Sequence, residues 1–494
     1  VAPVLVELIG TGLVGIQPYC ALLGLAQFFL IVAFEFHAGS YARSVWDFNI
    51  DNLSIIMILI AGIIGGLIAV YSLGYMAVYH RKHVDVKDRR SFFFFVVFLF
   101  LSAMFGLVMS NNLLYMYTFW EITSLCSFLL IGYSGTNEAI HNSFKALWMN
   151  LLGGLAFAMA IAYLGEHFYT LEISQLLSMG MQGMPVEPVV ALLVFCGFTK
   201  SAMMPFSGWL LGAMVAPTPT SALLHSSTMV KAGVFLIIKL APILGNNQAG
   251  IIAMLVGGIT FFFASCAAIS QSDGKKVLAY STISNLGLIV CCAGTGSYEA
   301  AWTAIMIVIF HAVAKSLLFL TVGTAEQQLG SRNLESFDGI FNSMPRLSLC
   351  MVIGICGMFL APFGMLISKW AALKAYVDSG SILLVIFLVF GSATTLFYWT
   401  KWLGTLVAVH HHSERLNNVT KKSEWTSLIS LSVLMVTLCL TFPLVSTYLI
   451  EPFLMEMYHQ YVPNLIGTGN LYIMIMMLCT ILVLPIAVRI LTLG

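Results

Sequence analysis

Charged residues are scarce in this sequence. Only 9% of its 494 residues are Asp, Glu, Lys or Arg, whereas soluble globular proteins use about 25%. Hydrophobic residues make up 60% of the chain, and the mean hydropathy is +0.95. This balance excludes a soluble globule and indicates an all-α polytopic membrane protein. The formal net charge of +1 gives no reason to expect nucleic acid as a partner.

Paired cysteine motifs are also missing. The ten cysteines are scattered, mostly inside apolar runs, and no CxxC occurs. We therefore expect no iron–sulfur cluster, zinc site or other metal or cofactor in this chain. The sequence also has no nucleophile elbow, phosphate loop or dinucleotide fingerprint. Any redox chemistry coupled to this chain must take place in other subunits, so whether the chain counts as part of an enzyme stays open.

Lysine and arginine are absent from four loops, at residues 165–187, 241–249, 294–299 and 450–470. A membrane helix needs about 20 apolar residues, and dividing the chain by such runs predicts about fourteen spans. The loop at 80–90, HRKHVDVKDRR, is the densest basic cluster. Because cytoplasmic loops collect Lys and Arg, this loop is predicted to be cytoplasmic, and alternation then places both termini on the same side of a prokaryotic inner membrane.

The stretch 195–239 is apolar enough for a bilayer yet carries Lys200, His225 and Lys231. A lysine at the bilayer centre costs roughly 2.5 to 3.5 kcal/mol on the mildest scales, so such residues usually serve a transport path. Pro205 cannot donate to the carbonyl four residues back, and its ring disrupts that turn. A helix break beside Lys200, with free backbone carbonyls, is what a midplane ion site needs. The alternative is a kinked packing helix with a snorkelling lysine.

Glu121 is the acidic counterpart in the segment 113–133. Thr118 and Ser124, three residues to either side, share its helical face, so a polar stripe faces other helices rather than lipid. A partner such as Lys200 would keep this carboxylate charged. We interpret Glu121 as part of an ion path, with a purely structural pair as the alternative.

His311 and Lys315 are four residues apart and are predicted to project from one helix face. Both side chains can carry protons, although a packing histidine with an interfacial lysine is the alternative. His225 and Lys231 are six residues apart and do not share a face on an ideal helix. They can still join one water chain if the segment near Thr228 is distorted.

A faint internal repeat links the two halves. The sequence PFSG that begins at Pro205 is echoed by the PFG that begins at Pro362, and each lies near a lysine, Lys200 or Lys369. Proline-broken spans in corresponding positions indicate a transporter site at a repeat interface. Lys369 is then a candidate end of the path, with snorkelling as the alternative. Two further lysines, Lys239 and Lys374, lie near span ends. We interpret both as snorkelling lysines, with the ion path as the alternative.

Four segments resemble, in the same order, the proton-conducting antiporter-like subunits of respiratory complex I, Mrp-type sodium/proton antiporters and energy-converting membrane hydrogenases. They are LLYMYTFWEITSLCSFLLIGY, GFTKSAMMPFSGWLLGAMVAPTPTSALLHSSTMVKAGVFLI, KKVLAYSTISNLG and HAVAKSLLFLTVG. Within this superfamily, GTAEQQLGSRNLESFDGIFNSMPRL followed by GMFLAPFGMLISKWAALKAY looks most like the large antiporter-like subunit of an Ech-type nickel-iron hydrogenase.

The resemblance implies a role for each matching residue. Glu121 and Lys200 match the family's glutamate–lysine pair, and the other ion-translocation positions are Lys231 with His225, Lys315 with His311, and Lys369. Two departures affect the geometry of the breaks and not the ionisable residues. Trp209-Leu210-Leu211 lacks the proline of the family's WLP, and Pro362 stands alone where a proline pair is common.

The fold implied is two inverted five-helix repeats with proline-broken helices. The expected division is residues 1–91 and 406–494 as flanking helices, 92–240 as the first repeat and 249–405 as the second. The resemblance implies translocation of protons, with sodium as the alternative, in a ferredoxin-dependent hydrogenase complex. Its nickel-iron site and iron–sulfur clusters would lie in partner subunits. Rival readings are an Mrp-type antiporter subunit, an NADH-quinone oxidoreductase subunit and a non-conducting membrane scaffold.

Overall fold

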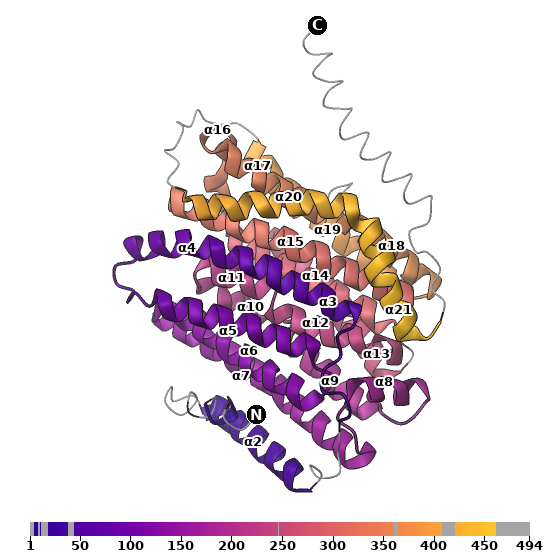
Figure 1. Ribbon diagram of the computed structural model, residues 1–494. Helices are drawn as coiled ribbons and strands as arrows, with labels where there is room; N and C mark the ends of the chain where they lie inside the picture. The colour runs from indigo at the N-terminus through magenta and orange to yellow at the C-terminus, as the bar shows by residue number, and fades with distance from the viewer. Residues whose placement is uncertain are drawn as a thin grey trace.

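The computed structural model describes residues 4–7, 10, 18–37, 44–245, 247–359, 364–407 and 420–460. Within these ranges the chain forms helices, and its β-type pairing is limited to bridges between single residues. Figure 1 shows most of the helices lying side by side in a bundle. Helices suit a bilayer because each satisfies its own backbone hydrogen bonds where water is absent. The prediction of an all-α membrane protein is confirmed.

The helices of the first half lead from the N-terminal flank to the interrupted segments around Lys200. They are α2 (Pro18–His37), α3 (Asn52–Leu59), α4 (Gly65–Lys82), α5 (Arg90–Met109), α6 (Leu113–Ile131), α7 (Asn137–Phe168), α8 (Ile173–Met181), α9 (Glu187–Lys200), α10 (Gly208–Gly212), α11 (Thr218–Ser226) and α12 (Met229–Leu240).

The helices of the second half include one of the two longest. They are α13 (Gln248–Ile269), α14 (Gly274–Gly294), α15 (Tyr298–Leu329), α16 (Ile340–Ser343), α17 (Pro345–Phe359), α18 (Gly364–Asp378), α19 (Ile382–Val407), α20 (Lys422–Val445) and α21 (Glu451–Tyr458). Short π-helical turns join α3 to α4 and α20 to α21.

Twelve helices or consecutive helix runs in the described ranges are long and apolar enough to cross a membrane. The predicted count of about fourteen is not confirmed. The predicted sixth span, 189–211, is divided between α9 and α10, and each is shorter than the 20 or so residues that a bilayer requires. The predicted last span, centred near residue 480, lies outside the described residues.

The two longest helices, α7 and α15, have matching surroundings. Each has 32 residues and begins after a hydroxyl cap, Thr136 or Ser297, whose side chain accepts a backbone N–H of the first turn. After each helix the chain forms an antiparallel bridge with the residue that caps the preceding helix. These bridges pair Asn112 with Glu172 and Asp273 with Asn333. The matching pattern agrees with two repeats of related structure.

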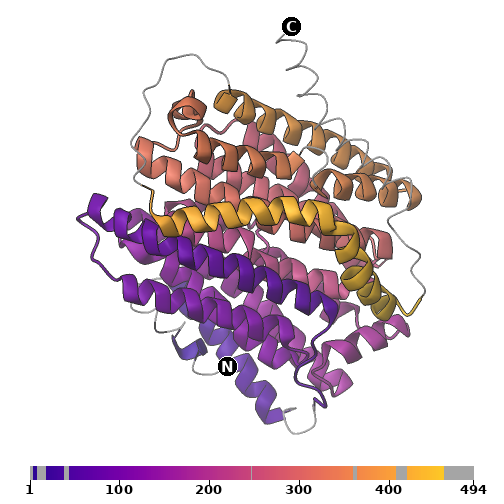
Figure 2. The ribbon, with the colours of Figure 1, turned by 45° about the horizontal axis from the view of Figure 1, so that its top comes forward.

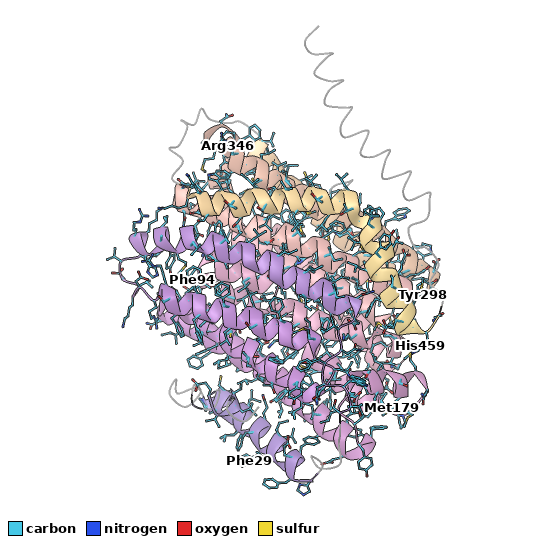
Figure 3. The ribbon with its side chains drawn as sticks, viewed as in Figure 1. Phe29, Phe94, Met179, Tyr298, Arg346 and His459 are labelled. Carbon is cyan, nitrogen blue, oxygen red and sulfur yellow. The ribbon has the colours of Figure 1, made fainter. Side chains whose placement is uncertain are left out.

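The core of the molecule is built around α15. It packs against α14, α11, α17, α18 and α20, and every residue from Ala300 to Ala325 is buried. By contrast, α2 lies at the periphery against α7, and its Phe29 is 64% exposed (Figure 3). An apolar exterior around a helix that carries buried histidine and lysine is typical of a membrane protein with an internal polar path.

The last described helix run crosses the outside of this core. α20 runs alongside α4 and packs on α15, in both views of the ribbon (Figure 1, Figure 2). Ser427 of α20 donates a hydrogen bond of 2.7 Å to the backbone carbonyl of Leu67 in α4. Helices α4 and α20, which lie far apart in the sequence, are therefore joined directly.

Candidate functional site

All seven residues predicted for ion translocation are described, and all are buried. They come from α6, α9, α11, α12, α15 and α18. They are Glu121, Lys200, His225, Lys231, His311, Lys315 and Lys369. Burying this many ionisable groups is costly, so their individual contacts decide what they can do.

The interruption beside Lys200 separates α9 from α10. α9 ends at Lys200 and α10 begins at Gly208, with Pro205 between them. Two carbonyls near the end of α9 are paired with residues that follow this helix. The carbonyl of Thr199 accepts the indole N–H of Trp209 at 2.9 Å, and the carbonyl of Phe198 accepts the N–H of Met203 at 3.0 Å. The turn after the break folds back and satisfies them.

The Lys200 ammonium reaches across to α6. Its Nζ donates to the carbonyl of Trp120 at 2.9 Å and to the hydroxyl of Ser124 at 2.7 Å. The same nitrogen lies 4.9 Å from the centre of the Trp120 ring, within the range of a cation–π contact. Lys200 is thus held by neutral acceptors on the helix that also carries Glu121.

Glu121 does not form the ion pair that the sequence predicts. Among the described residues, no carboxylate oxygen lies within 4 Å of the Lys200 ammonium, and neither oxygen of Glu121 has a hydrogen-bond partner. The reason is local geometry, because Ser124 and the Trp120 carbonyl already take the ammonium. The carboxylate turns instead toward α7.

Two consecutive glycines of α7 make room for this arrangement. A Cβ at Gly154 would lie 2.0 Å from Oε1 of Glu121, and a Cβ at Gly153 would lie 1.9 Å from the hydroxyl of Thr199, the neighbour of Lys200. A side chain at Gly154 would displace the Glu121 carboxylate, and one at Gly153 would displace the Thr199 side chain beside Lys200. The two glycines therefore set where Glu121 and the end of α9 lie.

The flanking helix α2 also reaches this region. Gln27 is fully buried, donates from Nε2 to the carbonyl of Leu151 at 2.7 Å and accepts the hydroxyl of Tyr117 at 2.6 Å. Tyr117 lies one turn before Glu121 on α6. These hydrogen bonds attach α2 to the two helices that surround the Glu121 carboxylate. The hydrophobic runs in the sequence do not predict this attachment.

The centre of the site is a direct contact between Lys231 and His311. The Lys231 Nζ lies 3.0 Å from Nδ1 of His311, and both residues are fully buried. Lys231 can face α15 because α11 ends at Ser226 and α12 begins at Met229, which leaves Thr228 with an irregular backbone of φ −124° and ψ −103°. The distortion near Thr228 that the sequence analysis considered is present.

His225 lies before this interruption, on α11. Its ring centre is 4.8 Å from that of Phe319 on α15, and among the described residues neither ring nitrogen has a hydrogen-bond partner. Buried polar groups in native proteins are nearly always paired, by protein or by ordered water. We therefore expect the ring nitrogens of His225 to bind water.

Lys315 points to a different helix from His311, although the two are one turn apart. Its Nζ donates to the carbonyl of Leu278 at 3.0 Å and to the hydroxyl of Ser281 at 2.6 Å, both on α14, and lies 5.1 Å from the Trp399 ring centre. Lys200 has the same kind of setting, with one carbonyl, one serine hydroxyl and one tryptophan face. Both halves of the chain thus hold a buried lysine in the same chemical environment.

Lys369 is buried on α18, with its Nζ 5.8 Å from the centre of the Phe261 ring. Pro362, the predicted second helix break, lies outside the described residues. The snorkelling prediction for Lys239 is wrong, because its ammonium is buried and forms an ion pair of 3.1 Å with Asp51. Lys374 is 64% exposed and pairs with Glu299 at 3.1 Å, as a lysine near a helix end can.

Lys275 and Glu326 were not among the residues predicted from the sequence. The structure buries Lys275 in the first turn of α14 and pairs it with Glu326 of α15 at 2.9 Å. The available signal was a glutamate at the end of an otherwise apolar segment. Among the described residues, no group of three or more His, Cys, Asp or Glu side chains is arranged to hold a metal ion.

Two sequence profiles of known families match this chain. The sequence profile described as "NADH:quinone oxidoreductase/Mrp antiporter, TM" matches residues 110–395. A second profile, described as "NADH-Ubiquinone oxidoreductase (complex I), chain 5 N-terminus", matches residues 36–85. The first match contains every predicted ion-translocation residue from Glu121 to Lys369.

Similar proteins include two from Staphylococcus aureus that bear the name antiporter subunit mnhA2. The one from strain USA300 / TCH1516 is 36% identical over 357 residues, which cover 68% of this chain and 44% of that protein. The one from strain JH9 is 33% identical over 453 residues, which cover 86% of this chain and 53% of that protein. The chain thus spans about half the length of the curated relatives it matches.

Two solved structures have a similar fold. A chain of the Mrp complex from Dietzia sp. DQ12-45-1b matches with a TM-score of 0.74 and 25% identity, over 99% of this chain and 55% of that one. A chain of the membrane-bound sulfane sulfur reductase, an archaeal respiratory membrane complex, matches in fold with a TM-score of 0.74 and 21% identity, over 94% and 97%. The first sequence profile matches more than half of the residues of this chain. The chain therefore belongs to the NADH:quinone oxidoreductase/Mrp antiporter transmembrane family.

Proposed function

We propose that this chain conducts protons across a prokaryotic cell membrane through the buried line Glu121, Lys200, His225, Lys231, His311, Lys315 and Lys369. The single observation that carries the proposal is the contact of 3.0 Å between Lys231 and His311 in the fully buried centre. Two nitrogen bases at hydrogen-bond distance can share a proton, and a scaffold has no use for the cost of burying them.

The rest of the line needs water between its members. The Glu121 carboxylate and the His225 ring have no protein partners among the described residues. Ordered water commonly pairs such buried groups, and a chain of water molecules relays protons between them. In this account, a proton on Lys231 repels a second positive charge at His311, so transfer proceeds in steps that depend on the charge of the neighbours.

Protons are favoured over sodium because four hydroxyls that could serve as sodium ligands, those of Thr118, Ser124, Ser201 and Thr228, do not form one cluster. Sodium needs several oxygen ligands around one point. The hydroxyls of Thr118 and Thr228 donate to the carbonyls of Leu114 and Leu223, on different helices. Those of Ser124 and Ser201 make contacts with Lys200 and the Val230 carbonyl.

The proposed division into repeats gives this line its arrangement. Residues 92–240 and 249–405 would form the two five-helix repeats, with 1–91 and 406–494 as flanks. Support comes from the matching 32-residue helices α7 and α15 and from the matching bridge that follows each of them. Each repeat would then supply one lysine that binds a serine hydroxyl, with the Lys231–His311 contact between them.

We further propose that the chain works inside a multi-subunit membrane complex of the energy-converting hydrogenase type. Ferredoxin oxidation, the nickel-iron site and the iron–sulfur clusters would belong to partner subunits, because this sequence has no redox ligand set. A second candidate, an Mrp-type antiporter subunit, is favoured by the relatives named mnhA2 and by the likeness to a chain of an Mrp complex. Co-purification of a nickel-iron hydrogenase subunit would support the first candidate, and its absence from an intact complex would support the second.

Ion uptake into inverted membrane vesicles tests the proposal directly. Vesicles that contain the native complex are energised with reduced ferredoxin in one series and with a sodium gradient in another, and internal pH and sodium are recorded. Acidification that a protonophore abolishes supports proton conduction. Sodium uptake that persists with the protonophore identifies sodium as the ion instead. An assembled complex that moves neither ion is a scaffold, and the proposal is then wrong.

A further inference from the structure

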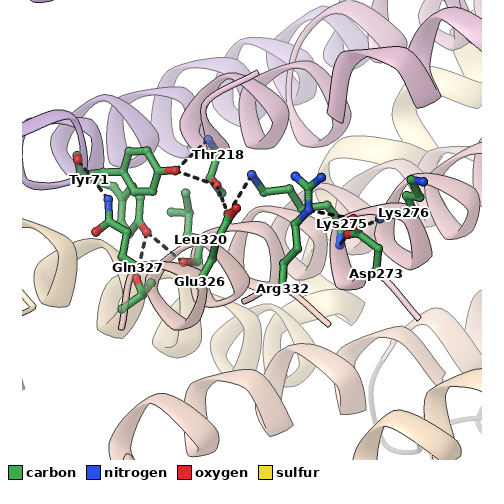
Figure 4. Close-up of polar contacts among 11 residues, drawn as sticks. Tyr71, Thr218, Asp273, Lys275, Lys276, Leu320, Glu326, Gln327 and Arg332 are labelled. Carbon is green, nitrogen blue, oxygen red and sulfur yellow. Dashed lines mark hydrogen bonds and ion pairs between the residues drawn. The ribbon is translucent and has the colours of Figure 1, made fainter. Parts of the chain in front are cut away.

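A buried ion pair closes one end of the α14–α15 region. Lys275 lies in the first turn of α14, and its Nζ is 2.9 Å from Oε2 of Glu326 near the end of α15 (Figure 4). The Lys275 side chain is 3% exposed and that of Glu326 is 27% exposed. The pair therefore has a buried member and a member that reaches the surface.

This surface belongs to the end of the bundle that carries the basic loop 80–90. Lys82, the last residue of α4, donates to the backbone carbonyl of Gln327, the residue after Glu326. Gln327 in turn donates from its side chain to the carbonyl of Tyr75 at 3.1 Å. Glu326 thus lies beside the loop that a bilayer would leave in water.

Glu326 also connects to the inside of the molecule through α11. The oxygen that pairs with Lys275 accepts a hydrogen bond of 3.4 Å from the hydroxyl of Thr218, the first residue of α11. That hydroxyl lies 3.1 Å from the Tyr75 hydroxyl, in the chain of contacts that Figure 4 shows. The same oxygen of Glu326 therefore contacts both Lys275 and the first residue of the buried helix α11.

One face of α11 is polar along its whole length. Thr218, Ser221 and His225 occupy positions i, i+3 and i+7, so they project from the same side of the helix. All three are fully buried. Among the described residues, the hydroxyl of Ser221 and both ring nitrogens of His225 have no hydrogen-bond partner. A buried face of this kind requires water or a mobile proton.

The polar face ends where the proposed relay begins. His225 is the last residue but one of α11, and Lys231, with its contact to His311, follows the interruption at Thr228. Polar groups therefore extend from Glu326 through α11 to the centre of the molecule. The neighbouring pair of Arg332 and Asp273 lies beside this entrance, where Arg332 places a second positive charge near Glu326 and Asp273 caps the N-terminus of α14.

We propose that the Lys275–Glu326 pair is the entrance at which protons pass between the aqueous phase beside loop 80–90 and the α11 face formed by Thr218, Ser221 and His225. A proton from water binds the Glu326 carboxylate, which weakens its contact with Lys275. The proton then moves along Thr218 and Ser221 to His225, and the ion pair forms again. This assignment rests on the proposed function, because it supplies the relay with its access from one side.

The first test separates a proton entrance from a purely structural ion pair. The double variant Lys275→Met/Glu326→Gln removes both charges and keeps the size of the side chains, so the complex is expected to assemble. We expect its proton uptake in vesicles to fall about tenfold or more, because the titratable group at the entrance is gone. Lys374→Met/Glu299→Gln, which removes a more exposed ion pair of 3.1 Å at the opposite end of α15, is the matched control and should keep normal uptake. Normal uptake in an assembled double variant overturns the proposal.

The second test does not depend on transport or on the charge pair. In Ser221→Cys, a small membrane-impermeant thiosulfonate reagent should label the new thiol from the side of loop 80–90 and not from the other side. Ser265→Cys is the control, because Ser265 is equally buried but hydrogen-bonded to Ser284 at 2.6 Å, and it should stay unlabelled. An unlabelled Ser221→Cys overturns the entrance. Labelling without any proton uptake by the native complex would retain the water access and reject the proposed function.

Discussion

The carboxylate of Glu121 occupies the space that a side chain at position 154 would fill. An ideal Cβ on Gly154 would lie 2.0 Å from Oε1 of Glu121, well inside van der Waals contact. The acid therefore faces α7, while Lys200 binds the α6 backbone and Ser124. The two residues therefore form no direct ion pair.

Gly154→Ala should displace the Glu121 carboxylate without changing any ionisable residue. Overpacking of this kind typically costs about 1 to 3 kcal/mol. We expect proton uptake to fall about tenfold, which corresponds to about 1.4 kcal/mol in an activation barrier. Gly66→Ala is the matched control, since nothing lies within 4 Å of a Cβ there. Uptake measured in vesicles should be normal in the control, and equal losses in both variants would reject the role given to Gly154.

Lys231 and His311 should behave as one unit. Because their nitrogens are 3.0 Å apart, the effects of Lys231→Met and His311→Gln on proton uptake should not add. A double-mutant cycle on uptake rates is expected to give an interaction energy of about 0.5 to 3 kcal/mol, the usual range for residues in contact. Strict additivity would mean that the two side chains act separately. Lys231→Met combined with Lys276→Ala, an exposed lysine, supplies the additive reference.

Substitutions at Asp51 should separate two contributions to stability, the ion pair with Lys239 and the cap of α3. Asp51 both pairs with Lys239 at 3.1 Å and accepts the N–H of Ser54 at 2.7 Å as the cap of α3. Asp51→Asn keeps a capping oxygen but leaves the buried ammonium without its partner, which should cost about 3 to 5 kcal/mol. Asp51→Ala should cost about 1 kcal/mol more through the lost cap. Thermal unfolding of the complex in detergent measures both, and an unchanged melting temperature in Asp51→Asn would contradict the role of the pair.

The attachment of α2 predicts a second stability effect. Tyr117→Phe leaves the Gln27 oxygen buried without its donor, which should cost about 1 to 3 kcal/mol. Tyr163→Phe is the control, because Tyr163 lies on α7 and is only partly buried. Limited proteolysis before α2 should become faster in the first variant and not in the second. Identical cleavage rates would show that α2 is held by apolar packing alone.

Much of this architecture could be predicted from the sequence. Hydrophobic runs locate the membrane-crossing helices because burial of apolar surface decides where they begin and end, and the charge left inside them identifies the seven ionisable residues. Local backbone chemistry is also readable. Pro205 removes a helix donor, so an interruption near Lys200 follows from the residue type alone.

Contacts between distant segments could not be predicted in the same way. The separation of Glu121 from Lys200 depends on Gly154, a residue of a third helix. Lys239 resembles a snorkelling lysine until the chain at Asp51 is brought beside it. Lys275 resembles a loop residue until α15 places Glu326 on it. In each case a single partner far along the chain decides the role.

Lys200→Ala is the simplest test of proton conduction through the buried line. The native complex and the variant, each checked for assembly, are compared for ferredoxin-driven proton uptake in inverted vesicles, with Lys276→Ala as the control for loss of an exposed lysine. We expect proton uptake to collapse in the Lys200→Ala complex and to be normal in the control. Unchanged uptake in an assembled Lys200→Ala complex would contradict this account, because the interrupted helix would then be structural and the ion path would lie elsewhere.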